Sequence, residues 1–147
     1  MADIHERTGS GVVAVQEVPR DQTGRYGIVS AGPADGREFP MERIVEKPDP
    51  ASAPSNLAVV GRYVLPAGIM DALAETGPGA GDEIQLTDAI QSFMAQAPVL
   101  AYRFPGVRFD CGSKLGYVEA MVRYALDDPE MGTDFAAYIK SLGETLC

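Results

Sequence analysis

The residues best suited to bind a charged ligand stand side by side where one predicted strand ends. Ile44 and Val45 form a short β-rich run, Glu46 and Lys47 follow, and Pro48 ends the strand. Side chains alternate along an ideal strand, but an end at Pro48 allows both charged groups to point toward the strand's mouth. A carboxylate accepts hydrogen bonds from two hydroxyls, as in a vicinal diol, and an ammonium is a compact charge for a phosphate. The alternative is an exposed ion pair that binds nothing.

A second carboxylate lies between a strand and a helix. Asp110 follows a short predicted strand at 107–109 and precedes Gly112 and Ser113, where a helix is predicted to begin. Mg²⁺ prefers oxygen ligands, so a carboxylate at this place can hold it, and the two following amides can add donors for an anion. Alternatively, Asp110 is only a turn or helix-capping residue.

Two further segments carry weaker signals. Gly27 follows the aromatic Tyr26 at the start of a predicted strand, where a glycine lets a ligand approach the backbone closely. A plain strand or turn glycine is the alternative. The acidic residues at 82, 83 and 88 have a simpler account, since acids are favoured at a helix N-terminus by the macrodipole.

Several kinds of active site do not fit the sequence. The glycines at 77, 79 and 81 do not follow a strand in a G-x-G-x-x-G pattern, and there is no G-x-x-x-x-G-K-[ST] run. The single histidine, His5, is remote from the other candidates, which argues against a Ser/His/Asp constellation. Cys111 and Cys147 lack zinc-ligand spacing. The sequence therefore predicts no dinucleotide fingerprint, P-loop, catalytic triad or zinc site.

A mixed α/β fold must position these groups, with a strand-rich first half followed by strands alternating with helices. Apolar β-rich runs predict strands at 12–15, 26–29, 44–45, 57–64, 99–104 and 107–109, with a hairpin loop at 31–37. Helices are predicted at 2–8, 67–75, between the loop at 77–81 and Pro98, after Ser113, and at 133–142. The last three helices have apolar faces made of Ile84, Leu86, Ile90, Phe93 and Met94, of Leu115, Val118, Val122 and Ala125, and of Phe135, Tyr138, Ile139 and Leu142.

The first predicted strand raises the expectation of a larger sheet. The helix at 2–8 looks severed and leads directly into the buried strand at 12–15. A strand without a neighbour on one side exposes an edge. We therefore expect the sheet to continue in sequence that is absent here.

The composition limits the partners. The chain has 147 residues, of which 46% are hydrophobic, so it suits one domain or a piece of a larger one. A net charge of −9 repels phosphate backbones, which argues against nucleic acid and a membrane surface. No run approaches a membrane span, and the first residues do not resemble a signal peptide. Two cysteines without a disulfide framework favour a reducing cytoplasm.

Six blocks, taken in order, are more specific than any one of them alone. They are VQEVP (15–19), YGIV (26–29), ERIVEKP (42–48), APSNLAVVGRY (53–63), GDEIQLTDAI (81–90) and FDCGSKLGY (109–117). In these blocks, and from about residue 6 to residue 142, the chain resembles the C-terminal half of the bacterial UTP–glucose-1-phosphate uridylyltransferases.

The resemblance implies a fold. It predicts a Rossmann-like mixed sheet of the sugar nucleotidyltransferase type, here incomplete because the N-terminal nucleotide-binding part is absent. In the family, a G-x-G-T-R loop, the uracil contacts and a first Mg²⁺-binding aspartate lie upstream. Residues 1–147 would then be the sugar-phosphate-binding part of the domain plus its C-terminal helices.

The resemblance also implies a reaction. UTP and glucose 1-phosphate give UDP-glucose and pyrophosphate with Mg²⁺, by direct attack of the sugar phosphate oxygen on the α-phosphorus. We expect this chain alone to be inactive, because such catalysis depends on positioning groups that it lacks. Two alternatives stay open: a sister enzyme that uses dTTP or another nucleotide, and a non-catalytic oligomerisation fragment. The family commonly forms homo-oligomers.

Residue by residue, the resemblance suggests a substrate site. Gly27, next to Tyr26, matches the backbone contact to the sugar, and Glu46 matches the acid that binds glucose hydroxyls. Lys47 matches the lysine on the phosphates, and Asp110 the second Mg²⁺-binding aspartate, so these two are the expected catalytic residues. Residues near the sugar also include Val59 and Val60. No role is transferred to Arg62, Asp82, Glu83, Asp88 or Lys114.

Overall fold

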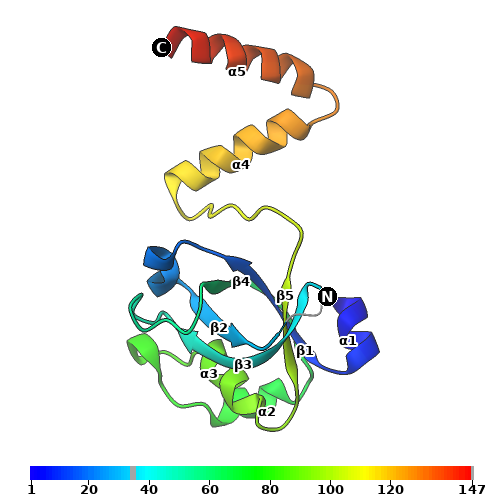
Figure 1. Cartoon of the computed structure of the whole chain (residues 1–147), viewed down its shortest axis with the longest axis vertical. Coiled ribbons are helices and arrows are strands. Elements are labelled where there is room, and N and C mark those ends of the chain that lie inside the picture. The colour runs from blue at the N-terminus through cyan, green and yellow to red at the C-terminus, as the bar shows by residue number, and fades with distance from the viewer. Residues whose placement is uncertain (34–35, 147) are drawn as a thin grey trace. The chain divides into compact units, whose positions relative to one another are not determined.

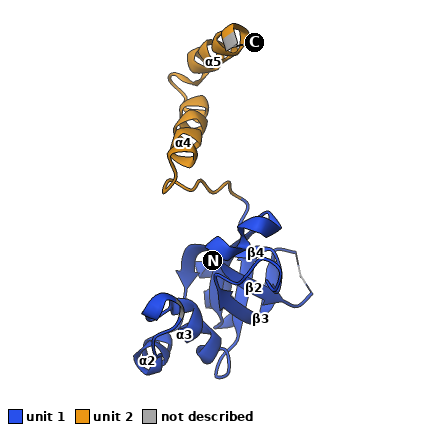
Figure 2. Ribbon diagram, turned by 90° about the vertical axis from the view of Figure 1, so that its left-hand side faces the viewer, with its two compact units in different colours: residues 1–105 blue, residues 106–147 orange. Residues whose placement is uncertain are grey.

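The computed structural model describes residues 1–33 and 36–146 of the chain. They form two compact units, Met1–Pro105 and Gly106–Cys147, which are coloured separately in Figure 2. Positions 34 and 35 of the predicted hairpin loop at 31–37, and Cys147, lie outside the described residues.

The first unit is built on strands that close on one another. They are β1 (Gly11–Glu17), β2 (Gly27–Ala31), β3 (Glu38–Glu46), β4 (Leu57–Val64) and β5 (Val99–Arg103). Their order is β1-β4-β2-β3-β5, and β5 pairs back with β1 to complete a barrel (Figure 1). The β1–β5 pair is parallel and the other four pairs are antiparallel. The prediction of a mixed sheet in an α/β fold is therefore confirmed.

The prediction that the first strand has an open edge was wrong. β1 pairs with β4 along one side, where Val15 lies opposite Val59, and with β5 along the other, where Val13 lies opposite Ala101. Closing the barrel supplies each strand with two neighbours and leaves no edge among the described strands. The helix before it, α1 (Ala2–Thr8), ends at Gly9, whose φ of 68° is the left-handed conformation that commonly ends a helix.

Branched apolar side chains fill the interior of this unit. Val12, Val13 and Val15 of β1 are fully buried, as expected for β-branched residues in a strand with neighbours on both sides. Helices α2 (Ile69–Glu75) and α3 (Leu86–Phe93) lie against the strands (Figure 1). The helical side of the core is Ile69, Ala72, Ala89, Ile90 and Phe93.

Two predicted details of the chain differ from the structure. Ile84 was expected on the apolar face of its helix, but α3 begins only at Leu86, after a turn in which Gly81 has φ 74°, and Ile84 is 62% exposed. The strand expected at 107–109 does not form, since this segment pairs with no described strand. Its Val107 is exposed.

The second unit consists of α4 (Lys114–Asp127) and α5 (Gly132–Leu146). Ser113 caps α4 as predicted, because its Oγ accepts a hydrogen bond of 3.0 Å from the Gly116 amide. Several members of the apolar faces predicted for these helices are exposed. Within this unit, α4 and α5 can cover only one side of each other, which leaves much of each apolar face without a neighbour from the unit itself. The exposed members are Leu115, Val118, Tyr138 and Leu142.

Within residues 1–33 and 36–146, no helix is long and apolar enough to cross a lipid bilayer.

Candidate functional site

The candidate site of the first unit begins at one pair of residues in the β2–β3 ladder. Gly27, the first residue of β2, lies opposite Glu46, the last residue of β3. Because Gly27 has no side chain, the Glu46 carboxylate can lie over its Cα. A Cβ placed on Gly27 would be 3.2 Å from Glu46 Oε2 and 3.5 Å from Val59 Cγ2. The structure thus brings together Gly27, Glu46 and Val59 from three adjacent strands.

A helix completes this cluster. The Thr87 hydroxyl of α3 donates a hydrogen bond of 3.2 Å to Glu46 Oε2. Its methyl carbon would be 3.0 Å from a Cβ on Gly27. On the other side, the Lys47 ammonium lies 3.7 Å from Glu46 Oε1. The Glu46 side chain is 16% exposed and that of Lys47 55% exposed, so the carboxylate is sheltered while the ammonium faces water.

The backbone at Lys47 explains how two consecutive side chains come to lie close together. Lys47 has a φ of 42°, in the left-handed region that residues other than glycine seldom adopt. It also precedes Pro48, which disfavours a helical backbone at the preceding residue. The Lys47 amide donates a hydrogen bond of 3.0 Å to the Tyr26 carbonyl, which holds this turn. The turn interrupts the alternation of the strand and keeps Lys47 beside Glu46.

Tyr63 of β4 adds a phenol to the cluster. Burial raises the pKa of the Tyr63 hydroxyl, and the nearby negative charge of Glu46 raises it further. Both causes favour the neutral phenol over the phenolate. Neither Tyr63 nor Thr87 was predicted from the sequence. Thr87 could have been noticed as a polar residue on the otherwise apolar face of its helix, whereas no local pattern distinguishes Tyr63.

The remaining candidates of this unit flank the cluster. Tyr26 is half-buried, and the Arg25 guanidinium carbon lies 5.8 Å from the centre of its ring. Val60 is half-buried and follows the buried Val59, so the two side chains point to opposite faces of β4. Val59 is the one that contacts the Gly27 position.

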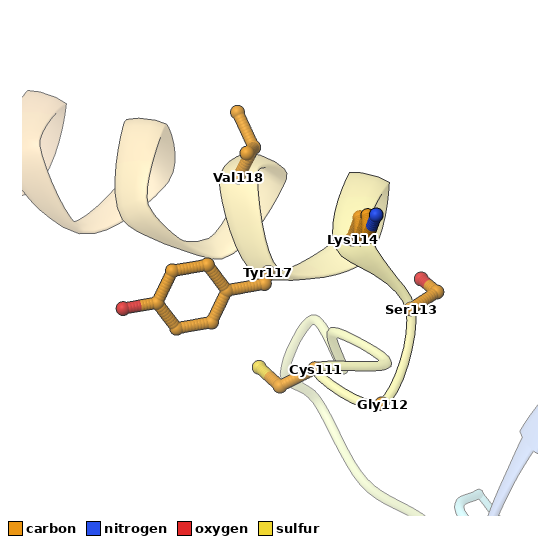
Figure 3. A pocket seen from close by; sticks show the side chains of 6 residues that line it. All are labelled: Cys111, Gly112, Ser113, Lys114, Tyr117 and Val118. Atoms are coloured by element: carbon orange, nitrogen blue, oxygen red, sulfur yellow. The ribbon is translucent and has the colours of Figure 1, made fainter.

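Asp110 belongs to the second unit and is built into a turn. Its Oδ1 accepts a hydrogen bond of 3.2 Å from the Gly112 amide. Its carbonyl accepts hydrogen bonds from the Ser113 amide at 3.1 Å and the Ser113 hydroxyl at 3.0 Å. The following residues line a surface pocket of about 410 Å³ at the start of α4 (Figure 3). Its lining consists of Cys111, Gly112, Ser113, Lys114, Tyr117 and Val118.

The donor set at Asp110 is small. In the part of the chain that the structure describes, no three His, Cys, Asp or Glu side chains gather to hold a metal ion. Asp110 can therefore offer one carboxylate to a cation whose other ligands come from elsewhere, which is how Mg²⁺ is commonly held when a bound phosphate supplies oxygens.

The titration of Tyr63 tests the closeness of its phenol to Glu46. Glu46→Gln removes the charge, so the pKa of Tyr63 should fall, yet stay above 10 because burial is the larger cause. Both causes penalise the phenolate, so the free energy of unfolding should fall as the pH rises from 10 toward the folded-state pKa of Tyr63. Tyrosine ¹³Cζ shifts followed against pH measure the change. Glu42→Gln, an exposed carboxylate on β3, is the control and should leave the Tyr63 titration unaltered. An unchanged Tyr63 pKa in Glu46→Gln would contradict the proximity.

The left-handed backbone at Lys47 predicts an unusual order of stabilities. Lys47→Ala and Lys47→Gly both remove the ammonium, but only glycine adopts a φ of 42° without strain. The free energy of unfolding should therefore be about 1 kcal/mol higher for Lys47→Gly than for Lys47→Ala. Asp71, which is exposed within α2, provides the control. There Asp71→Ala should be more stable than Asp71→Gly, because glycine destabilises a helix relative to alanine. Urea denaturation measures both pairs, and an alanine variant that is as stable as the glycine variant at position 47 would refute the strain.

Known proteins resemble this chain closely over about half of their own length. A UTP–glucose-1-phosphate uridylyltransferase of Staphylococcus epidermidis is 48% identical over 142 residues, which are 97% of this chain and 49% of the relative. The solved structure of UTP-bound UGPase from Acinetobacter baumannii has a TM-score of 0.84 and 44% identity, over 97% of this chain and 49% of that one. A UDP-glucose pyrophosphorylase complexed with UDP-glucose has a TM-score of 0.82 and 38% identity, over 87% and 49%.

These matches confirm the family that the six sequence blocks indicated. The chain spans about half the length of the curated relatives it matches. The family model described as nucleotidyl transferase matches residues 1–126, which include the whole first unit, the Glu46 cluster and Asp110. The chain therefore belongs to the nucleotidyl transferase family.

Proposed function

We propose that this chain is part of a UTP–glucose-1-phosphate uridylyltransferase and carries its subsite for glucose 1-phosphate. The observation that carries the proposal is the Glu46 carboxylate held over the Cα of Gly27, with the Lys47 ammonium 3.7 Å from its other oxygen. The names of the relatives support it, since they include UTP–glucose-1-phosphate uridylyltransferase and structures bound to UTP or UDP-glucose.

Each group of the cluster suits one part of a sugar phosphate. The Glu46 carboxylate accepts hydrogen bonds from sugar hydroxyls, and Gly27 lets the sugar ring approach the backbone. The exposed Lys47 ammonium attracts the phosphate. We propose that Tyr26, Val59 and Val60 border the sugar, with Val59 providing an apolar wall beside Gly27.

In the proposed reaction, a phosphate oxygen of glucose 1-phosphate forms a bond to the α-phosphorus of UTP, and the bond from that phosphorus to pyrophosphate breaks. UDP-glucose and pyrophosphate are the products. Lys47 would neutralise charge as the two anions approach, and Glu46 with Gly27 would orient the sugar. The relatives are about twice as long, so we propose that their other half completes the UTP site and that this chain alone turns over little substrate.

We propose Asp110 as a Mg²⁺ ligand of the full-length enzyme. Its carboxylate is of the right chemical kind, and substrate phosphates would supply further oxygens. Bound Mg²⁺ reduces the repulsion between the anionic reactants. The Gly112 amide on Oδ1 orients the carboxylate without using all of its acceptor capacity.

Nucleotide, assembly and location are further parts of the proposal. We propose UTP, and not dTTP, as the nucleotide, because the relatives' names give UTP. The exposed apolar residues of α4 and α5 support a homo-oligomer, as such surfaces favour association. The free, exposed thiol of Cys111 suits a reducing cytoplasm. A non-catalytic oligomerisation fragment remains the second candidate, and the same apolar residues favour it.

Binding of glucose 1-phosphate to Glu46 variants tests the proposal. Glu46→Gln should weaken binding about tenfold, because one carboxylate oxygen becomes an amide that donates instead of accepting. Amide NMR titrations of the chain measure the dissociation constant, with shifts expected around Gly27 and Lys47. Glu42→Gln removes an exposed carboxylate of the same strand and should bind as the unaltered chain does. A dispersed spectrum without ligand shifts would favour the oligomerisation fragment.

The role of Asp110 is tested with a paramagnetic substitute for Mg²⁺. In the presence of Mn²⁺ and UDP-glucose, amide signals near Asp110 should broaden strongly, and Asp110→Asn should abolish this because it removes the anionic ligand. Asp127→Asn, which loses a carboxylate paired with Arg123 on the same helix as Lys114, should keep the broadening. Equal broadening in Asp110→Asn would remove this residue from the metal site.

A further inference from the structure

Thr87 is a polar residue in an apolar place. It is 5% exposed, and the other buried residues of α3 are Ala89, Ile90 and Phe93, which belong to the hydrophobic core. A buried hydroxyl needs a hydrogen-bond partner, because burial without one is costly. Thr87 finds its partner outside its helix, in Glu46 Oε2 at 3.2 Å, and not in a backbone carbonyl of the preceding turn.

This bond fixes one end of the carboxylate. The last torsion of a glutamate side chain is soft, so a carboxylate held at a single point can rotate. Glu46 is held at two points, with Oε2 accepting from Thr87 and Oε1 lying 3.7 Å from the Lys47 ammonium. The ion pair is weak at this distance and exposed on the lysine side, which leaves the Thr87 bond as the sheltered anchor.

The methyl group of Thr87 constrains the same place. Its Cγ2 would be 3.0 Å from a Cβ on Gly27, closer than an ordinary van der Waals contact. Thr87 therefore limits the space above Gly27 while its hydroxyl orients the carboxylate beside that space. A single side chain thus sets both the position of the acceptor and the volume next to it.

We infer that Thr87 is a positioning residue for sugar recognition, which orients the Glu46 carboxylate toward the hydroxyls of the bound sugar. The inference rests on the proposed function, because it assigns the hydroxyl-binding role to Glu46. Thr87 acts through Glu46 and leaves the phosphate to Lys47. The effect of losing its hydroxyl is therefore specific to the sugar and spares the phosphate.

Three variants separate orientation from simple packing. Thr87→Val keeps the branched shape and removes the hydroxyl, and Thr87→Ser keeps the hydroxyl and removes the methyl. Thr76→Val is the matched control, since its hydroxyl donates only to the Ala72 carbonyl at 2.7 Å, at the end of α2. Amide NMR titrations of the whole chain with glucose 1-phosphate, and separately with inorganic phosphate, give the dissociation constants.

We expect Thr87→Val to weaken binding of glucose 1-phosphate about tenfold, the usual effect of one lost hydrogen bond to a charged group. Inorganic phosphate should bind it as it binds the unaltered chain. Thr87→Ser should restore most of the sugar phosphate affinity, and Thr76→Val should change neither constant. Equal affinities for Thr87→Val and the unaltered chain, or an equal loss for both ligands, would overturn the positioning role.

A measurement without ligand distinguishes this inference from the proposed function. In a double-mutant cycle, Thr87→Val should lower the midpoint of thermal unfolding less in a Glu46→Leu background, where the acceptor is gone, than in the unaltered chain. Additive effects would overturn the Thr87–Glu46 coupling itself. A different result would overturn the proposed function: the two residues are coupled, but the unaltered chain does not bind glucose 1-phosphate. The role of Thr87 in sugar recognition would then fall with the proposed function.

Discussion

The pairing of Gly27 with Glu46 at the end of the β2–β3 ladder is the constraint on which the candidate site depends. A shift of one residue in this register would turn Glu46 to the other face of its strand. It would also place a side chain where the carboxylate now lies over Gly27. The register itself is held by the core, because Ile28, Val29 and Ile44 are buried next to this pair. Packing of the core thus determines the position of the Glu46 carboxylate.

The two charged groups of the cluster differ in their exposure to water. Glu46 is sheltered among Thr87, Val59 and the backbone of Gly27, whereas the Lys47 ammonium is exposed. Glu46 and Lys47 are adjacent in sequence, and the left-handed backbone at Lys47 allows one side chain to be sheltered while the other is exposed. Such local strain persists where the surrounding structure holds it, here through the Lys47 amide and the Tyr26 carbonyl. The site therefore combines a sheltered, hydrogen-bonded acceptor with an exposed cation.

Local patterns predicted most of the strands and singled out Gly27, Glu46 and Lys47, whereas Val59 came from the family resemblance and Thr87 and Tyr63 were missed. The run LAVVGRYV matches β4, and the end at Pro48 anticipated that Glu46 and Lys47 would lie close together. Thr87 could not be assigned, because its partner is 41 residues away in sequence. The closed sheet was missed for the same reason, since the β1–β5 pairing joins distant segments. Ile84 was wrongly placed on the apolar face of its helix, because helical periodicity does not reveal that Gly81 turns the chain before α3 begins.

The closure of the barrel has a consequence for how the first unit folds. β1 ends at residue 17 and its parallel partner β5 begins at residue 99, so the last pairing must wait for almost the whole unit to be synthesised. Contacts between segments so far apart in sequence slow folding, because the intervening chain loses entropy before the contact forms. During synthesis, β1 and β3 expose their edges until β5 arrives between them. Unpaired strand edges favour aggregation, so the first unit is most open to it while the place of β5 between β1 and β3 is still empty.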